Sequence, residues 1–165
     1  MTQRHDVDFY RWTQEQAALL RGMSRDTCPL DLDNLAEEIE ALGRAEIRIN
    51  SSLLHRVVVR LLKSVIDPDT PSDEPLFEET VASQGDAVLA FSPGLKQRID
   101  LEKIWRAACN GAIRSMEKRG VTIPALPANC PLTLDELLDP EFDPDKAAKT
   151  LATALQMAAP GRHGR

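Results

Sequence analysis

The apolar residues between positions 32 and 66 follow the spacing of one long helix. Four of the first recur three or four positions apart: Leu32, Leu35, Ile39 and Leu42. The pattern resumes after Gly43, and a single glycine costs a helix only about 1 kcal/mol. We therefore predict one helix over 32–66, or two with a break near Gly43 or at 50–52. These four side chains are expected to form its buried face.

The start of this helix carries three separate signals. The side chain of Asp31 can accept hydrogen bonds from amides of the first turn. Asp33 adds a negative charge near the positive end of the helix dipole. Leu30 and Leu35 have the spacing of a hydrophobic staple. Together these features predict a helix that begins directly after Asp31.

Helices on both sides of this one are indicated by caps and by proline. Asp6 can cap a first helix that ends near Gly22, in which Phe9 and Trp12 supply the bulkiest apolar groups. Residues 67–73 contain two prolines among aspartate, serine and threonine, a composition typical of a connector. A further helix is expected over 74–90.

The second half of the chain repeats such start signals. Ser92 followed by Pro93 predicts the start of a helix of nearly thirty residues that ends at Gly120. Residues 133–136 match a capping box, which opens a short helix. Asp143 before Pro144 predicts a last helix that ends at Pro160.

The composition agrees with a helical core. Aromatic residues make up only 4% of the 165 residues, so the 42% of hydrophobic residues are mostly aliphatic. The predicted fold is all-α, an antiparallel helical bundle with two long helices and short peripheral helices. We expect a single helical domain over 1–160 and a frayed tail over 161–165.

Three blocks of the sequence resemble a known family. They are residues 8–12 (DFYRW), 30–44 (LDLDNLAEEIEALGR) and 130–142 (CPLTLDELLDPEF). In order and spacing they are similar to the signature blocks of a bacterial family catalogued as domain of unknown function 29, over roughly 5–145. The resemblance implies a compact all-α cytoplasmic protein and supplies no activity, substrate or catalytic residue. We expect structural roles for the following signature residues: Phe9, Tyr10, Trp12, Asp33, Asn34, Glu37, Glu38, Cys130 and Pro131.

The sequence departs from that family after residue 62. The family members compared have a leucine-rich segment that ends in a Lys-Trp pair and continues into a basic helix. Here Lys63 is followed by Ser64, and the segment 67–79 is acidic. If the family has a basic functional surface at this place, the acidic segment replaces it.

The cysteines and the hydropathy pattern bear on location. Cys28, Cys109 and Cys130 are odd in number and lack the spacing of a metal site, which favours reduced thiols in a cytoplasm. The first residues lack the apolar run of a signal peptide, and no stretch approaches about 18 apolar residues. We expect a cytoplasmic protein without a membrane segment.

A metal site is the first chemical hypothesis, and it has four weak candidate ligands: Glu37, Glu38, Glu40 and His55. Carboxylate metal sites in helical bundles use Glu-x-x-His motifs, and the Glu37-x-x-Glu40 pair lacks the histidine. Glu37 or Glu38 could instead be a buried carboxylate that a group such as Tyr10 or Trp12 satisfies. We predict no cofactor and leave the metal open.

Nucleophilic catalysis and nucleic-acid binding have weaker support. Cys109 lies on a predicted core face, whereas Cys130 precedes a helix start that could lower the pKa of its thiol. We assign no catalytic residue. Arg56, Arg60 and Lys63 form a modest basic stripe, but the net charge of −6 disfavours nucleic acid.

The charge is unevenly distributed along the chain. Residues 67–86 hold seven acidic residues and no basic one, whereas residues 96–119 hold seven basic and three acidic residues. These segments either pair with each other across the bundle or form a surface for a partner.

The sequence leaves two hypotheses for function. The first is a small cytoplasmic helical module that binds an unknown protein partner or its own copy, through acidic surfaces at 31–40 and 67–79. The alternative is a metal-dependent enzyme that uses the carboxylates of the second predicted helix.

Overall fold

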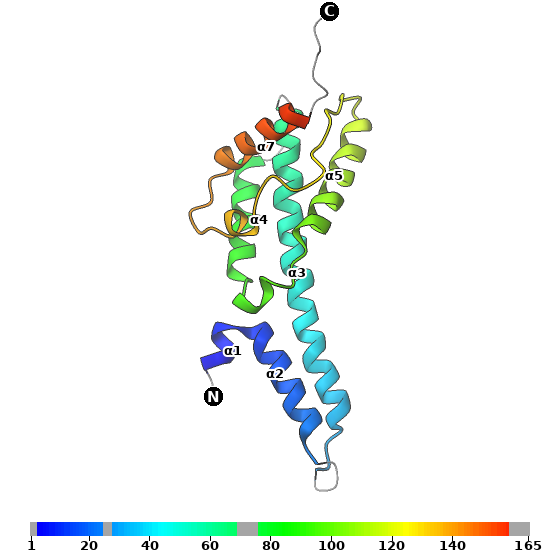
Figure 1. Ribbon diagram of the computed structural model, residues 1–165, viewed down its shortest axis with the longest axis vertical. Coiled ribbons are helices and arrows are strands. Elements are labelled where there is room, and N and C mark those ends of the chain that lie inside the picture. The colour runs from blue at the N-terminus through cyan, green and yellow to red at the C-terminus, as the bar shows by residue number, and fades with distance from the viewer. Residues whose placement is uncertain (1–2, 25–27, 69–75, 159–165) are drawn as a thin grey trace, which may run out of the picture. The chain divides into compact units, whose positions relative to one another are not determined.

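The computed structural model describes residues 3–24, 28–68 and 76–158 (Figure 1). The regular structure of these residues is helical, which confirms the all-α prediction. The elements in chain order are α1 (Gln3–Val7), α2 (Phe9–Gly22), α3 (Leu32–Ile66), α4 (Leu76–Leu89), the 3-10 helix η1 (Pro93–Leu95), α5 (Leu101–Glu117), α6 (Leu134–Leu137) and α7 (Pro144–Ala158).

The long helix is confirmed as one unbroken element, α3. The Asp31 carboxylate accepts a hydrogen bond from the Asn34 amide at 3.2 Å, as expected for the cap. Gly43 remains helical, and its missing side chain leaves room for Thr13 of α2, whose hydroxyl a Cβ at position 43 would overlap. The glycine therefore permits close helix packing and does not end the helix.

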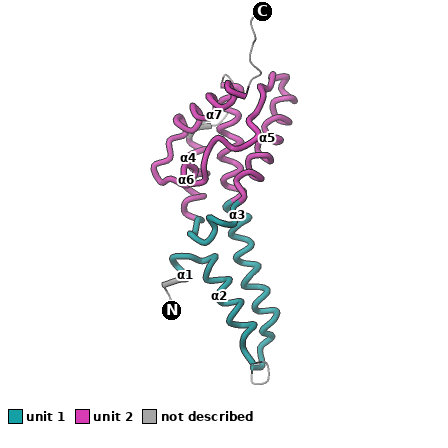
Figure 2. The backbone as a smooth tube through the Cα atoms, viewed as in Figure 1, with its two compact units in different colours: residues 1–50, 90–99 teal, residues 51–89, 100–165 magenta. Residues whose placement is uncertain are grey.

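The chain divides into two compact units (Figure 2). Unit 1 contains residues 1–50 and 90–99, and unit 2 contains residues 51–89 and 100–165. A single domain over 1–160 therefore stays a prediction, and the tail over 161–165 lies outside the described residues.

Unit 1 is a helical hairpin with one added segment. Helix α2 runs antiparallel to the first half of α3 (Figure 1). An ion pair between Arg21 and Glu40 links the two helices. The segment that contains η1 packs against the start of α2, where a Cβ on Gly94 would lie 2.7 Å from the Asp8 carboxylate. Arg98 lies over the Tyr10 ring, 6.0 Å from its centroid.

Unit 2 contains the larger buried core. Trp105 of α5 is 1% exposed, and its indole N–H donates to the Pro127 carbonyl at 3.0 Å. Helix α4 is joined to α3 by an ion pair of 2.6 Å between Arg60 and Glu79. The Gln84 amide donates to the carbonyl of Asp139 at 2.8 Å, which fixes the loop after α6 against α4.

The helix starts at residues 133 and 143 are confirmed. Thr133 and Glu136 form both hydrogen bonds of a capping box, and α6 begins after them. The Asp143 carboxylate accepts from the amides of Asp145 and Lys146, and Pro144 is the first residue of α7.

Two predicted helix starts were wrong. The first helix does not run continuously from Asp6, because Asp8 accepts from the Arg11 amide and begins α2 separately from α1. The predicted helix of nearly thirty residues after Ser92 is broken: η1 ends at Leu95, and α5 begins after Asp100. The Asp100 carboxylate accepts from the Lys103 amide, whereas the Ser92 side chain makes no capping bond. Among the helices of the described residues, α3 is the longest with 35 residues, and α5 has 17.

Candidate interaction surface

The candidate metal ligands do not form a cluster. Glu37 and Glu38 are exposed on α3, so neither is the buried carboxylate that one interpretation required. Glu40 pairs with Arg21 of α2 and, at 3.7 Å, with Arg44. His55 lies in the other compact unit. Within 3–24, 28–68 and 76–158, no three His, Cys, Asp or Glu side chains are placed to share a metal ion.

Three acidic residues of the second block, Asp33, Glu37 and Glu40, instead act on one arginine, Arg21. The hydrogen bond from Arg21 lowers the pKa of Glu40, and the same bond raises the pKa of Arg21. The charges of Asp33 and Glu37 raise the pKa of Arg21 further. These carboxylates therefore help to hold α2 against α3, although each lies near the surface, where such pairs contribute little.

The other signature residues of unit 1 occupy the hairpin. Tyr10 is buried, and the Asn34 side-chain amide donates to the Asp31 carboxylate at 2.6 Å. Phe9 and Trp12 are half-buried and stack with ring centroids 5.7 Å apart. Since these two rings are only half-buried, they do not anchor a core in the way that Trp105 does.

The two cysteines considered as nucleophiles are protected thiols. Burial raises the pKa of Cys109 to about 11 and also raises the pKa of Cys130 to about 11. The lowered pKa suggested for Cys130 was therefore wrong. Its backbone N–H donates to the Glu102 carboxylate at 3.2 Å, and the following Pro131 is half-buried, so this segment is fixed against α5.

Several charges of unit 2 pair within the fold. The Arg119 guanidinium lies 2.8 Å from the Asp67 carboxylate, which joins the acidic and basic segments as one of the two interpretations expected. Arg60 of the basic stripe is engaged by Glu79 and Ser83 of α4. The stripe therefore offers fewer cations to a phosphate backbone than the sequence suggested.

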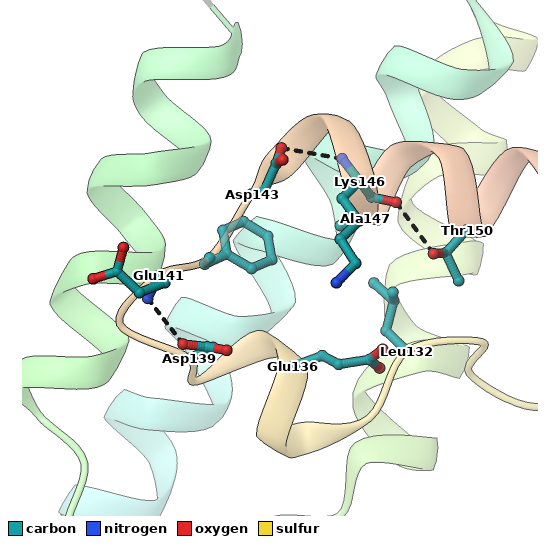
Figure 3. A pocket seen from close by; sticks show the side chains of 9 residues that line it. Leu132, Glu136, Asp139, Glu141, Asp143, Lys146, Ala147 and Thr150 are labelled. Atoms are coloured by element: carbon teal, nitrogen blue, oxygen red, sulfur yellow. Dashed lines mark hydrogen bonds between the residues drawn. The ribbon is translucent and has the colours of Figure 1, made fainter.

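A small pocket of about 70 Å³ lies in unit 2 beside α6 and α7 (Figure 3). Its lining includes several carboxylates, but backbone amides already engage three of them. Asp139 accepts from the Glu141 amide, Asp143 accepts from the Lys146 amide, and Glu136 accepts from Thr133. This volume is small beside the roughly 300–1,000 Å³ of pockets that hold small-molecule ligands. The third signature block therefore builds capped turns around this pocket.

A different feature stands out in unit 1, where bulky apolar side chains are exposed. Of the ten large hydrophobic residues that are exposed among the described residues, seven belong to this unit. Five of the seven lie on α3 or at the end of α2: Leu19 (64%), Met23 (50%), Leu35 (39%), Leu42 (51%) and Ile49 (48%). Single exposed apolar residues are normal, but a group of this size indicates an interaction surface.

This group corrects the predicted buried face of α3. Leu35 and Leu42 were expected in the core. The buried positions in this half of α3 are instead Leu32, Ala36, Gly43 and Asn50. Ala36 and Gly43 are small and let α2 approach closely. The leucines, one position earlier in each turn, are rotated about 100° away from α2.

The exposed apolar side chains of α2 and of α3 both lie away from the contact between the two helices. On α2 the buried positions are Tyr10, Thr13 and Ala17, and the stripe through Trp12, Leu19 and Met23 lies on the opposite side of the helix. We call the outward apolar surface of the two helices, made of Trp12, Leu19, Met23, Leu35, Ile39, Leu42 and Ile49, the hairpin face.

The fold and this surface define a small all-α protein with an open apolar face. The family model described as "Domain of unknown function DUF29" matches residues 5–143, and the chain belongs to this family. The crystal structure of an alpha-helical protein of unknown function from Rhodospirillum rubrum ATCC 11170 is similar, with 33% sequence identity and a TM-score of 0.82. The match covers 89% of this chain and 96% of that one.

No protein with a curated description matches the chain. None of the helices in the described ranges is long and apolar enough to cross a membrane.

Proposed function

We propose that this protein is a cytoplasmic interaction module that binds another protein chain through the hairpin face. The observation that carries the proposal is the exposure of Leu19, Leu42 and Ile49 on the outward surface of the hairpin, each between 48% and 64%. Full burial of such a side chain is worth about 1.5–3 kcal/mol, and a partner that covers one that is half exposed gains about half of that. A protein partner that covers this face would recover that free energy.

The spacing of the exposed residues supports this function. Leu35, Ile39, Leu42, Glu46 and Ile49 alternate between four- and three-residue steps, the repeat that helices use to pack along a common seam. Only Glu46 interrupts the apolar series. A stripe of this kind suits a helical partner better than an irregular loop.

The enzyme hypothesis lacks a comparable observation. Glu37 and Glu38 are exposed and belong to a different compact unit from His55, and three carboxylates of the small pocket accept from backbone amides. Reduced thiols also agree with a cytoplasmic location, since Cys28, Cys109 and Cys130 form no disulfide in the part of the chain described.

The proposal is tested by native mass spectrometry of the protein purified from its own cells. We expect wild type to carry a protein partner and the Leu42→Glu variant to lose at least about 90% of it, because the new carboxylate would be buried in the apolar seam, against the apolar side chains of the partner. The matched control is Leu89→Glu, since Leu89 of α4 is 86% exposed but lies in unit 2. Equal losses in both variants would contradict the proposal.

A further inference from the structure

Along α3 the charges beside the exposed apolar stripe are acidic. The α3 segment has three acidic residues at positions on the side of Leu35, Leu42 and Ile49: Asp31, Glu38 and Glu46. The two arginines of this half of α3, Arg44 and Arg48, lie about 100° or more from that stripe. On α2, Arg11 bonds Glu15 at 3.0 Å and Arg21 pairs with Glu40.

Two of these acids are placed to meet a partner. Glu46 is half-buried and occupies a seam position between Leu42 and Ile49. Glu38 is exposed and lies at the outer edge of the same stripe, about 60° from Leu35. A partner that covers the apolar residues therefore also covers or borders these two carboxylates.

A second copy of this chain is a poor occupant of the face. Two identical hairpin faces would bring Glu38 and Glu46 of one copy close to the same residues of the other, and neither face supplies a cation for them. Like charges in such a position cost several kcal/mol at an interface. A contact between two copies that buries one of these carboxylates without a positive partner is also strongly unfavourable.

We propose that the hairpin face binds a basic amphipathic helix of a partner protein. This inference rests on the proposed function and names the chemistry of the partner. The partner helix presents apolar side chains at three- and four-residue spacing to Leu35, Leu42 and Ile49. Lysine or arginine side chains beside its apolar stripe pair with Glu38 and Glu46. The apolar contact supplies affinity, and the charge pairs select basic helices over acidic ones.

Two synthetic helical peptides test this inference directly. Both carry leucine at alternating three- and four-residue spacing over about 21 residues; one has lysine and the other glutamate at the flanking positions. Binding to the full chain is measured by fluorescence anisotropy at about 0.15 M salt. We expect the lysine peptide to bind at least about 10-fold more tightly, with the preference shrinking as salt is added.

Reversing the charges of Glu38 and Glu46 distinguishes a specific pairing with the peptide from a general attraction by the net negative charge of the protein. The Glu38→Lys/Glu46→Lys variant is expected to reverse the preference, so that the glutamate peptide binds more tightly. The control is Glu78→Lys/Asp86→Lys, which changes the net charge equally at two exposed positions of α4. That control must keep the preference for the lysine peptide. If it loses the preference to the same extent, or if the lysine peptide does not bind wild type, the inference is overturned.

A further measurement distinguishes this inference from the proposed function. Sedimentation velocity of the full chain is expected to show a monomer at about 100 µM. A dimer that the Leu42→Glu substitution dissociates would mean that a second copy covers the face. The proposed interaction surface would then stand, and the basic helical partner would be wrong.

Discussion

Replacing Trp105 by alanine is expected to lower the free energy of unfolding by about 3–5 kcal/mol. The Trp105 side chain is 1% exposed in the core of unit 2, so its removal leaves a cavity that the neighbouring helices cannot fill. It also removes the hydrogen bond from the indole N–H to the Pro127 carbonyl. Urea denaturation followed by circular dichroism measures the change.

Two other variants show which part of the indole matters. Trp105→Phe keeps most of the apolar volume but cannot donate to Pro127, and we expect a loss of about 1–2 kcal/mol. Trp12→Ala is the matched control, because Trp12 is only half-buried on the hairpin face. This substitution should lower the free energy of unfolding by clearly less than Trp105→Ala. Equal costs for Trp12→Ala and Trp105→Ala would show that the core of unit 2 is wrongly assigned.

Gly43→Ala is the second substitution with a large expected effect. A methyl group at this position overlaps the hydroxyl of Thr13 and lies 3.4 Å from the Tyr10 ring. Thr13 is fully buried, and its hydroxyl donates to the Tyr10 carbonyl at 2.7 Å, so it cannot turn aside freely. Overpacking of about 1–3 kcal/mol should exceed the roughly 1 kcal/mol that alanine adds to a helix.

The control for this experiment is Gly85→Ala in α4, where a Cβ meets nothing within 4 Å. There the intrinsic preference of alanine for helices acts alone, and we expect stabilisation by up to about 1 kcal/mol. The two substitutions should therefore change the urea midpoint in opposite directions. Stabilisation by both would show that α2 does not approach α3 closely at Gly43.

The positions of the helices were largely predictable from the sequence because their start signals are local. Asp31, Asp143 and the capping box at 133–136 act on amides within three residues, and no knowledge of the tertiary fold is needed to recognise them. Residues 92–100 show the limit of this reasoning. Ser92 and Asp100 both have the side chain of a cap, and only the folded chain shows that Asp100 begins the helix.

The buried side of α3 was harder to predict, because apolar spacing alone does not say which neighbouring residues face a partner helix. Leu32, Leu35 and Leu42 share a face by spacing, yet only Leu32 is buried. The useful signal was the pair of small residues Ala36 and Gly43, seven positions apart, which marks where α2 packs closely. The hairpin face follows directly from that correction.

The surroundings of the candidate functional residues could not be predicted from the sequence for a related reason. Glu37, Glu38 and Glu40 were considered as ligands because of their chemical type, but their surroundings decide their roles. Arg21 is 19 positions from Glu40, and no local pattern connects the two. The thiol of Cys130 is likewise governed by burial in unit 2, which sequence spacing does not reveal.

The measurement that tests the hairpin face most directly is site-specific photo-crosslinking in living cells. A benzophenone side chain at position 42 should yield a discrete adduct with a partner protein, whereas the same group at position 89, which is more exposed, should yield little. Mass spectrometry of the adduct would identify the partner segment, which we expect to be a basic amphipathic helix. An adduct at position 89 equal to that at position 42, or no adduct at position 42, would contradict a protein-binding role for this surface.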